Sequence, residues 1–276
     1  MGSVADMGPS TSGTTHVNGA DIYWERSGSG PRLFFVNGSG ATLADVQLLL
    51  APLAERFDVL AHDHRGMGRS SAPPGPTTMA DYAGDIAGLL DATGWDDCAV
   101  MGVSFGGMVA QEYAVTWPDR LDRLALMCTS PGGEGGASYP LDQLAELPVE
   151  QRIAVGTTLL DTRFTPDFLA AHPDQQGFVD LFAAGQTQER TPEAADGARR
   201  QLEARSHHDV CDRLHLITCP TRVASGQFDG IAPPANGAYI AEHVPHAEQR
   251  LYDGGHMFFV QDPTALPETL DFLSGS

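Results

Sequence analysis

Hydrophobic residues along the chain follow two spacings that alternate from the N-terminal region onwards. Short continuous apolar runs, typical of buried strands, stand between segments whose apolar residues recur at three and four positions, as on one helix face. Segment 77–92 shows the second spacing, with Tyr82, Ile86 and Leu89 on one face and Thr78 as a candidate N-cap. This alternation predicts an α/β fold, in which helices cover both faces of a mostly parallel sheet.

Eight strands are predicted, at 15–17, 21–26, 32–36, 57–61, 98–101, 121–128, 221–224 and 248–252. The pair Asn18-Gly19 between the first two favours a tight hairpin turn. Helices are expected over about 43–56, 77–92, 234–244 and 264–273, and between Gly106 and Pro118.

The strand pattern stops after Ser130, where the glycine-rich stretch Pro131–Gly136 indicates a flexible hinge. The following residues, to about 206, are polar with helical spacing, and we interpret them as a cap inserted between two strands. The expected organisation is a disordered tail over 1–14, an α/β core over 15–131 and 207–276, and a helical cap over 132–206.

The net charge of the chain limits the kinds of partner that it is expected to bind. The 276 residues include 36 acidic and 16 basic side chains, for a formal net charge of −20. Such a surface repels nucleic acid and anionic membranes, so neither is an expected partner. All basic residues are arginine, and the absence of lysine excludes Schiff-base chemistry and a Ser–Lys dyad.

The four cysteines are Cys98, Cys128, Cys211 and Cys219, and their spacing suggests neither a disulfide framework nor a metal site. No apolar run is long enough to cross a membrane, and the N-terminal residues do not resemble a secretory signal. We therefore expect a cytoplasmic protein without metal or cofactor. The sequence carries no signal for its oligomeric state.

The most informative stretch is Gly102-Val103-Ser104-Phe105-Gly106, which lies between a predicted strand and a predicted helix. A Gly-x-Ser-x-Gly pattern in that context is typical of a nucleophile elbow, whose flanking glycines remove side chains that would collide in the tight turn. A serine hydroxyl is a poor nucleophile until a base takes its proton. Ser104 therefore requires a base and an orienting acid elsewhere in the chain.

Asp229 and His256 are the best candidates for the acid and the base. Each follows a predicted strand, and parallel strands collect functional groups at their carboxyl ends. Asp253 is an alternative acid, but it lies three residues from His256, and we interpret it as the end of its strand. The alternative bases, such as His64 and the pair His207-His208, are interpreted as structural or surface residues.

An oxyanion hole requires two preorganised N–H donors. One is expected from Phe105, next to the nucleophile. The other is expected from the loop after the strand 32–36, with Ser39 as first choice and Gly38 as second.

Together these motifs resemble the α/β-hydrolase fold family over residues 15–273, in the branch of capped serine esterases and enol-lactonases. The matching stretches are Asn37-Gly38, Asp63-His64-Arg65-Gly66-Met67-Gly68-Arg69-Ser70, Gly102–Gly107, Gly226–Asp229 and Gly254-Gly255-His256. The resemblance implies that the Asp63–Ser70 turn is structural. Family members usually carry His-Gly where this chain has Asn37-Gly38.

The triad and the resemblance imply hydrolysis of a carboxylic ester or lactone through an acyl-enzyme, on a small-molecule substrate. Cleavage of carbon–carbon bonds in ring-fission diketones is an alternative, although the cap region lacks the tryptophan typical of those hydrolases. A perhydrolase and a non-hydrolytic, cyclase-like member of the fold are further alternatives. The expected substrate-binding side chains are Asn37, Phe105, Phe164, Phe168 and Phe182.

Overall fold

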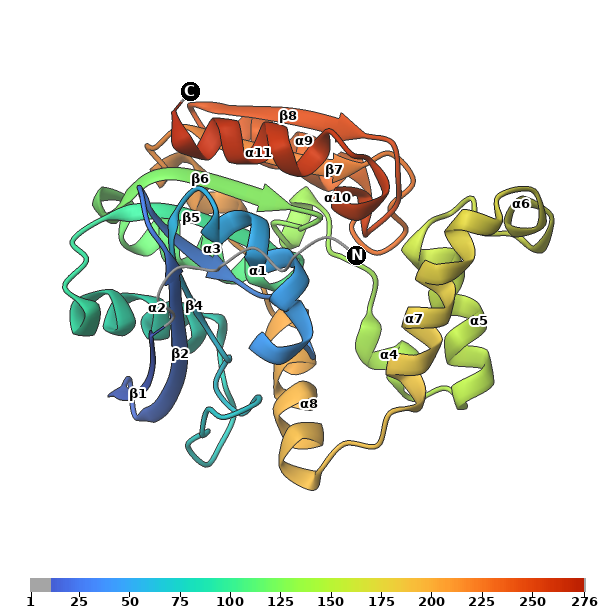
Figure 1. Cartoon of the computed structure of the whole chain (residues 1–276), viewed down its shortest axis with the longest axis horizontal. Coiled ribbons are helices and arrows are strands. Elements are labelled where there is room, and N and C mark those ends of the chain that lie inside the picture. Colours follow the sequence, from blue (N-terminus) through green and yellow to red (C-terminus); the bar gives the residue numbers. More distant parts are fainter. Residues whose placement is uncertain (1–10, 276) are drawn as a thin grey trace.

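The computed structural model describes residues 11–275, whose strands form one eight-stranded sheet in the order β1-β2-β4-β3-β5-β6-β7-β8 (Figure 1). β2 pairs antiparallel with β1 and β4, and all other neighbours pair in parallel. The predicted α/β fold with a mostly parallel sheet is confirmed. The strands are β1 (Thr11–Val17), β2 (Ala20–Gly28), β3 (Arg32–Val36), β4 (Asp58–His62), β5 (Cys98–Val103), β6 (Leu121–Met127), β7 (Thr221–Gly226) and β8 (Ala247–Tyr252).

The first strand begins earlier than the sequence predicts, so the expected tail over 1–14 is wrong for its last residues. β1 starts at Thr11, which pairs with Arg26 of β2. Gly13 lies under the ring of Trp24, where a β-carbon would come within 2.9 Å of the ring. Asn18 and Gly19 both have positive φ, as in the tight turns whose twist matches that of the paired strands. This turn allows β1 and β2 to pair along the whole of β1. Residues 1–10 lie outside the described part of the chain.

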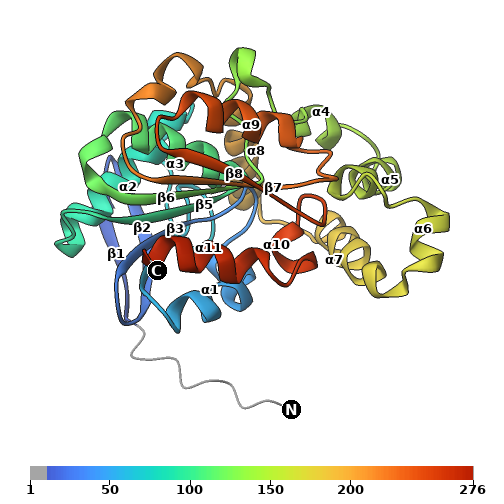
Figure 2. The same cartoon turned by 90° about the horizontal axis from the view of Figure 1, so that it is seen from above.

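Two layers of helices cover the sheet (Figure 2). Side chains of β3 show why, because Phe34 and Val36 are buried on one face while Leu33 and Phe35 are buried on the other. Helices α2, α3 and α9 pack on the first face, and α1, α10 and α11 on the second. Their bounds are α1 (Gln47–Ala54), α2 (Met79–Thr93), α3 (Phe105–Thr116), α9 (Pro234–His243), α10 (Phe258–Gln261) and α11 (Ala265–Ser274).

Five helices separate β6 from β7 in the chain and lie beyond the sheet (Figure 1). They are α4 (Leu141–Ala145), α5 (Val149–Leu160), α6 (Pro166–Ala171), α7 (Gln176–Thr187) and α8 (Pro192–Ser206). α5 and α7 pack closely because Gly156 faces the ring of Phe182. α8 lies apart from α5, α6 and α7 in Figure 1 and packs on the core, where Gly197 contacts Gly66. The short 3-10 helices are η1 (Leu43–Val46), η2 (Pro118–Arg120), η3 (Gly133–Gly135), η4 (Pro173–Gln175) and η5 (Cys211–Leu216).

The glycine-rich stretch after β6 is closely packed, which differs from the flexible hinge that the sequence suggests. A β-carbon on Gly132 would stand 1.8 Å from the carbonyl oxygen of His208, and one on Gly136 would stand 2.3 Å from Asn236. Both glycines have positive φ. Glycine is required here for backbone conformation and close approach.

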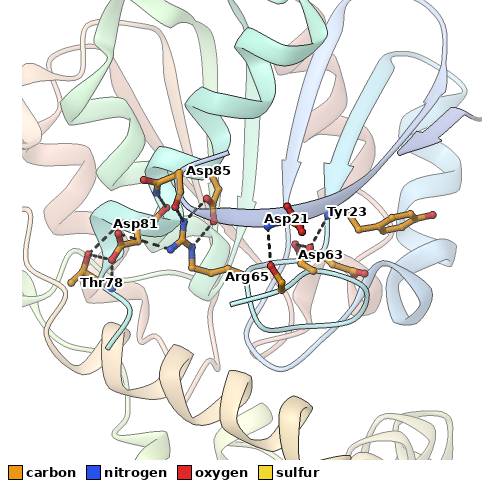
Figure 3. A network of polar contacts seen from close by, with 10 residues as sticks. Asp21, Tyr23, Asp63, Arg65, Thr78, Asp81 and Asp85 are labelled. Atoms are coloured by element: carbon orange, nitrogen blue, oxygen red, sulfur yellow. Dashed lines mark hydrogen bonds and ion pairs between the residues drawn. The ribbon is translucent and has the colours of Figure 1, made fainter. Parts of the chain in front are cut away.

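A buried ion pair anchors the turn that follows β4 (Figure 3). Arg65 donates two hydrogen bonds to the carboxylate of Asp85 on α2, at 2.6 and 2.7 Å, and both side chains are almost fully buried. A third bond joins Arg65 to the carbonyl oxygen of Asn18 in the β1–β2 turn. One guanidinium therefore connects the hairpin, the turn and α2.

The same turn is held to its neighbours by Asp63 and Ser70. The carboxylate of Asp63 accepts hydrogen bonds from the backbone N–H groups of Leu43 and Arg69. The hydroxyl of Ser70 donates to the carbonyl of Asp63 and accepts from the N–H of Tyr23 on β2. These contacts give the Asp63–Ser70 turn the structural role that the resemblance implies.

Replacing Arg65 alone is expected to leave a buried carboxylate without its partner. We expect Arg65→Leu to lower the free energy of unfolding by about 3–5 kcal/mol, measured by urea denaturation. The double variant Arg65→Leu/Asp85→Leu should recover most of that loss. Arg199→Leu, which removes an exposed arginine paired with Asp196 and Glu203, should change stability by less than about 1 kcal/mol. Equal losses in the two single variants would contradict this account.

Candidate active site

Ser104 lies in the turn between β5 and α3, with φ of 55° and ψ of −115°. Positive φ is rare for a residue with a side chain and marks a strained turn. The flanking glycines permit it, because a β-carbon on Gly102 would stand 2.4 Å from the carbonyl oxygen of Gly106. A β-carbon on Gly106 would stand 2.1 Å from that of Val36. The strand–turn–helix context predicted for this motif is present.

Three side chains from distant parts of the chain form a hydrogen-bonded series at the carboxyl edge of the sheet. The Nε2 atom of His256 lies 3.0 Å from the Oγ of Ser104, and its Nδ1 lies 2.8 Å from Oδ2 of Asp229. Since a carboxylate only accepts, Nδ1 carries the proton and Nε2 is free to accept one from the serine hydroxyl. The structure thus brings Ser104, His256 and Asp229 together.

The Asp229 carboxylate is fixed by its own loop. Its Oδ1 atom accepts hydrogen bonds from the N–H groups of Ile231 and Ala232, both at 2.8 Å, and the residue is only 3% exposed. These bonds aim the second oxygen at His256 and satisfy a charge that is removed from water. The carboxylate can therefore orient the imidazole without a further partner.

The rival residues lie elsewhere. Asp253 is exposed and pairs with Arg163. His208 is fully enclosed, and burial lowers its pKa to about 3, so it stays neutral at the pH of most assays. His64 is also buried, behind the loop that follows β3.

That loop, Asn37–Gly40, borders Ser104. A β-carbon on Gly38 would stand 3.9 Å from the β-carbon of Ser104. The N–H of Gly38 already donates to Oδ1 of Asn37, which makes it a poor second choice as an oxyanion donor. Phe105 is the first residue of α3, so its N–H has no acceptor within the helix.

Two hydrogen bonds hold the Asn37–Gly40 loop, one from His64 in the core and one to Gln201 on α8. Nε2 of His64 donates to the carbonyl oxygen of Asn37 at 2.9 Å, and burial lowers the pKa of His64 to about 4. The N–H of Gly40 donates to the side-chain oxygen of Gln201 on α8, at 2.7 Å. The loop next to the nucleophile is therefore positioned partly by the core and partly by α8.

A cavity of about 930 Å³ lies between the helices after β6 and the core. Ser39 and Gly40 border it from the loop after β3, and Ile231 from the loop of Asp229. Its lining is mixed, since apolar side chains alternate with charges of both signs. The charged residues are Asp142, Glu146, Arg152, Arg190, Arg199 and Glu203.

Of the five side chains expected to bind substrate, the cavity is lined by Phe182 alone. The ring of Phe105 packs edge-on against His64 and Tyr82 in the core, so only its backbone can face a ligand. The Asn37 side chain is used within its own loop.

Phe164 and Phe168 pack on each other, and Phe168 also stacks on His172. Neither phenylalanine lines the cavity. The sequence does not single out Ile231, and it presents Arg190 only as one of several cap arginines, for which solvated ion pairing is the favoured interpretation. A signal for Ile231 was present, because it is an apolar residue two positions after the predicted acid.

No group of three or more histidine, cysteine, aspartate or glutamate side chains within residues 11–275 could hold a metal ion. None of the helices in this range is long and apolar enough to cross a membrane.

Comparison with known proteins gives consistent matches. A family model described as alpha/beta hydrolase fold matches residues 31–263. The chain is similar to 3-oxoadipate enol-lactonase 2 of Acinetobacter baylyi, with 27% identity over 87% of each chain. It is 29% identical to the poly(3-hydroxyalkanoate) depolymerase of Ectopseudomonas oleovorans, over 88% of this chain and 84% of the relative. Among solved structures, the enol-lactonase from Burkholderia xenovorans superposes with a TM-score of 0.78 at 23% identity, covering 95% of this chain and all of that one.

The buried, neutral His64 makes a pH dependence testable. Its pKa is lowered from 6.5 to about 4 on folding, so the unfolded chain takes up the proton first as pH falls. The stability that it contributes is complete above pH 6.5 and is lost between about 6.5 and 4. We expect the drop in unfolding free energy between pH 7 and 4.5 to be about 2 kcal/mol smaller in His64→Gln, measured by urea denaturation. Identical drops in both proteins would refute this.

Proposed function

This chain belongs to the alpha/beta hydrolase fold family, and from that premise we propose that it hydrolyses a carboxylic ester or lactone through an acyl-enzyme. The observation that carries the proposal is the uninterrupted series of hydrogen bonds from Asp229 through His256 to Ser104. The relative named as an enol-lactonase supports a lactone among the substrates.

In the proposed reaction, the Oγ of Ser104 attacks the substrate carbonyl while Nε2 of His256 takes the hydroxyl proton. The negative charge that develops on the carbonyl oxygen is stabilised by the N–H groups of Phe105 and Ser39. The imidazolium then gives its proton to the departing alcohol, or to the ring oxygen of a lactone. This leaves an ester of Ser104.

The second half of the reaction repeats these roles with water. His256 removes a proton from a water molecule that attacks the acyl-enzyme, and it then protonates Oγ of Ser104 as the acid leaves. Asp229 remains ionised throughout and stabilises the imidazolium that forms in each half. Its two backbone hydrogen bonds hold the carboxylate in the orientation that this role requires.

The cavity supports a substrate of moderate size. Phe182, Leu144 and Leu159 from the cap helices, with Ile231 from the core, supply apolar surface for an acyl or alcohol portion. Because Ser39 and Gly40 also border this space, a group bound there lies beside Ser39, one of the two proposed oxyanion donors.

Arg190 differs from the other arginines of the cavity. Arg199 pairs with Asp196 and Glu203, whereas Arg190 has no carboxylate or carbonyl partner within residues 11–275. Its Nη2 atom lies 3.2 Å from the point where a β-carbon on Gly40 would stand. We propose that this cation at the edge of the loop favours substrates that carry an anionic group.

Removing the nucleophile tests the mechanism. We expect Ser104→Ala and His256→Ala to lower kcat by about 10⁴–10⁶, because both groups act as one unit. The measurement is turnover in a screen of short and long acyl esters, lactones and ring-fission diketones, with fluorophosphonate labelling of Ser104 in the wild-type chain. Wild-type turnover by Ser104→Ala on every ester or lactone that is cleaved would overturn the proposal. Activity confined to diketones would replace it with carbon–carbon bond hydrolysis.

Removing the unpaired cation tests substrate preference. We expect Arg190→Ala to lower kcat/KM about tenfold for an aryl monoester of a dicarboxylic acid, because a charge-assisted hydrogen bond is lost. The ester of the uncharged monocarboxylic acid of equal length should change little. Arg200→Ala is the matched control, since Arg200 pairs with Asp196 outside the cavity lining. An equal loss on both esters would rule out a role in charge recognition.

A further inference from the structure

The C-terminal end of α5 contacts both loops that carry catalytic side chains. We call residues Leu159–Arg163 the α5-end segment, residues Phe228–Gly230 the acid loop, and residues Asp253–His256 the histidine loop. The carbonyl oxygen of Leu159 accepts a hydrogen bond from the N–H of Gly230, at 3.0 Å.

Two further backbone bonds complete this contact. The carbonyl oxygen of Leu160 accepts from the N–H of His256 at 2.5 Å, and the N–H of Thr162 donates to the carbonyl of Phe228 at 2.9 Å. A segment from the region between β6 and β7 thus bonds to the loops after β7 and β8. The separation of Asp229 and His256 depends in part on a segment outside the sheet.

Glycines make this approach possible. A β-carbon on Gly255 would stand 1.9 Å from the carbonyl oxygen of Leu160, and one on Gly230 would stand 2.9 Å from the Cα of Leu159. The α5-end segment therefore lies against bare backbone in both loops. No side chain separates it from the peptide groups adjoining the triad.

A polar cluster fixes the segment to the histidine loop. Asp161 is fully buried and accepts two bonds from the guanidinium of Arg163, at 2.7 and 2.9 Å, one from the Arg163 backbone N–H at 3.0 Å, and one from Gln261 at 3.0 Å. Gln261 in turn accepts from the N–H of Gly255 at 2.8 Å. Asp161 is consequently connected through one side chain to the residue before His256.

Arg163 spans the two loops. Its Nη1 atom donates to Asp253 of the histidine loop at 2.7 Å, and its guanidinium lies 4.0 Å above the ring of Phe228 in the acid loop. Its other donors hold Asp161. The planar, forked guanidinium suits these simultaneous contacts, which a single ammonium group could not reproduce.

We propose that Arg163 is a positioning residue: by clamping the α5-end segment to the acid and histidine loops, it sets the alignment of His256 with Asp229 and Ser104. The inference rests on the proposed function. Arg163 itself lies outside the lining of the cavity. Its replacement should therefore lower kcat and leave substrate binding almost unchanged. Misplacement of a catalytic group by about 1 Å costs on the order of a hundredfold in rate.

The test compares Arg163→Ala and Arg163→Lys with the wild-type chain on a short-acyl p-nitrophenyl ester. We expect Arg163→Ala to lower kcat about 10- to 100-fold while KM changes less than about threefold. Arg163→Lys should recover only part of the loss, because it keeps the charge but not the bidentate contact. Arg222→Ala should leave kcat unchanged, because Arg222 also pairs with a carboxylate (Glu248) and lies over an aromatic ring (Phe272), but near the start of β7, away from the site.

A proton NMR readout separates this inference from the proposed function. The Nδ1 proton of His256, which is bonded to Asp229, should give a low-field resonance in the wild type that broadens or moves upfield in Arg163→Ala. This signal does not require turnover, so it tests the clamp even if Ser104 proves unreactive towards a fluorophosphonate. If Arg163→Ala does not fold, Asp253→Ala removes only the acceptor of the exposed contact and should broaden or shift the same resonance. Wild-type kcat and an unmoved resonance in a folded variant would overturn the inference.

Discussion

The site depends on one constraint, which is that backbone segments approach each other without intervening side chains. At the nucleophile, Gly106 lies against the carbonyl of Val36 at the end of β3. Near Asp229 and His256, a β-carbon on Gly226 would stand 2.0 Å from the carbonyl oxygen of Gly255. These contacts bring the ends of β3, β5, β7 and β8 close enough for short side chains to meet. A larger residue at any of these positions requires displacement of backbone, which cannot be relieved by a change of rotamer.

Much of this architecture follows from local sequence patterns. Apolar runs ending in glycine identify the strands, and the order Ser104, Asp229, His256 follows from which runs end in reactive residues. The strand start at Thr11 was missed because Thr, Ser and Gly have no apolar pattern. That segment is ordered by pairing with β2, which is a tertiary effect. The sequence indicates flexibility at glycines 132–136 for the same reason, because the residues that pack against them lie far away in sequence.

The substrate pocket was less predictable than the triad. Aromatic residues at helical spacing indicate that a side chain is buried, but not whether it packs in the core or faces a ligand. Phe105 and Phe164 are buried in packing, while Phe182 borders the cavity. The sequence does not reveal the partners of the Asn37 amide either, which hydrogen-bonds to the backbone of Gly38 and of Thr42. Charge composition does not reveal that Arg190 pairs with no carboxylate of residues 11–275, although the chain is strongly acidic.

The bond between Gly40 and Gln201 gives α8 a second role besides covering the core. The loop beside the nucleophile takes part of its support from a helix outside the sheet. A bulky molecule that displaces α8 outward would therefore remove support from the loop proposed to bind the oxyanion, although the molecule itself still fits. Discrimination by size would then be expressed in the rate of the chemical step, with little change in how tightly the molecule is held.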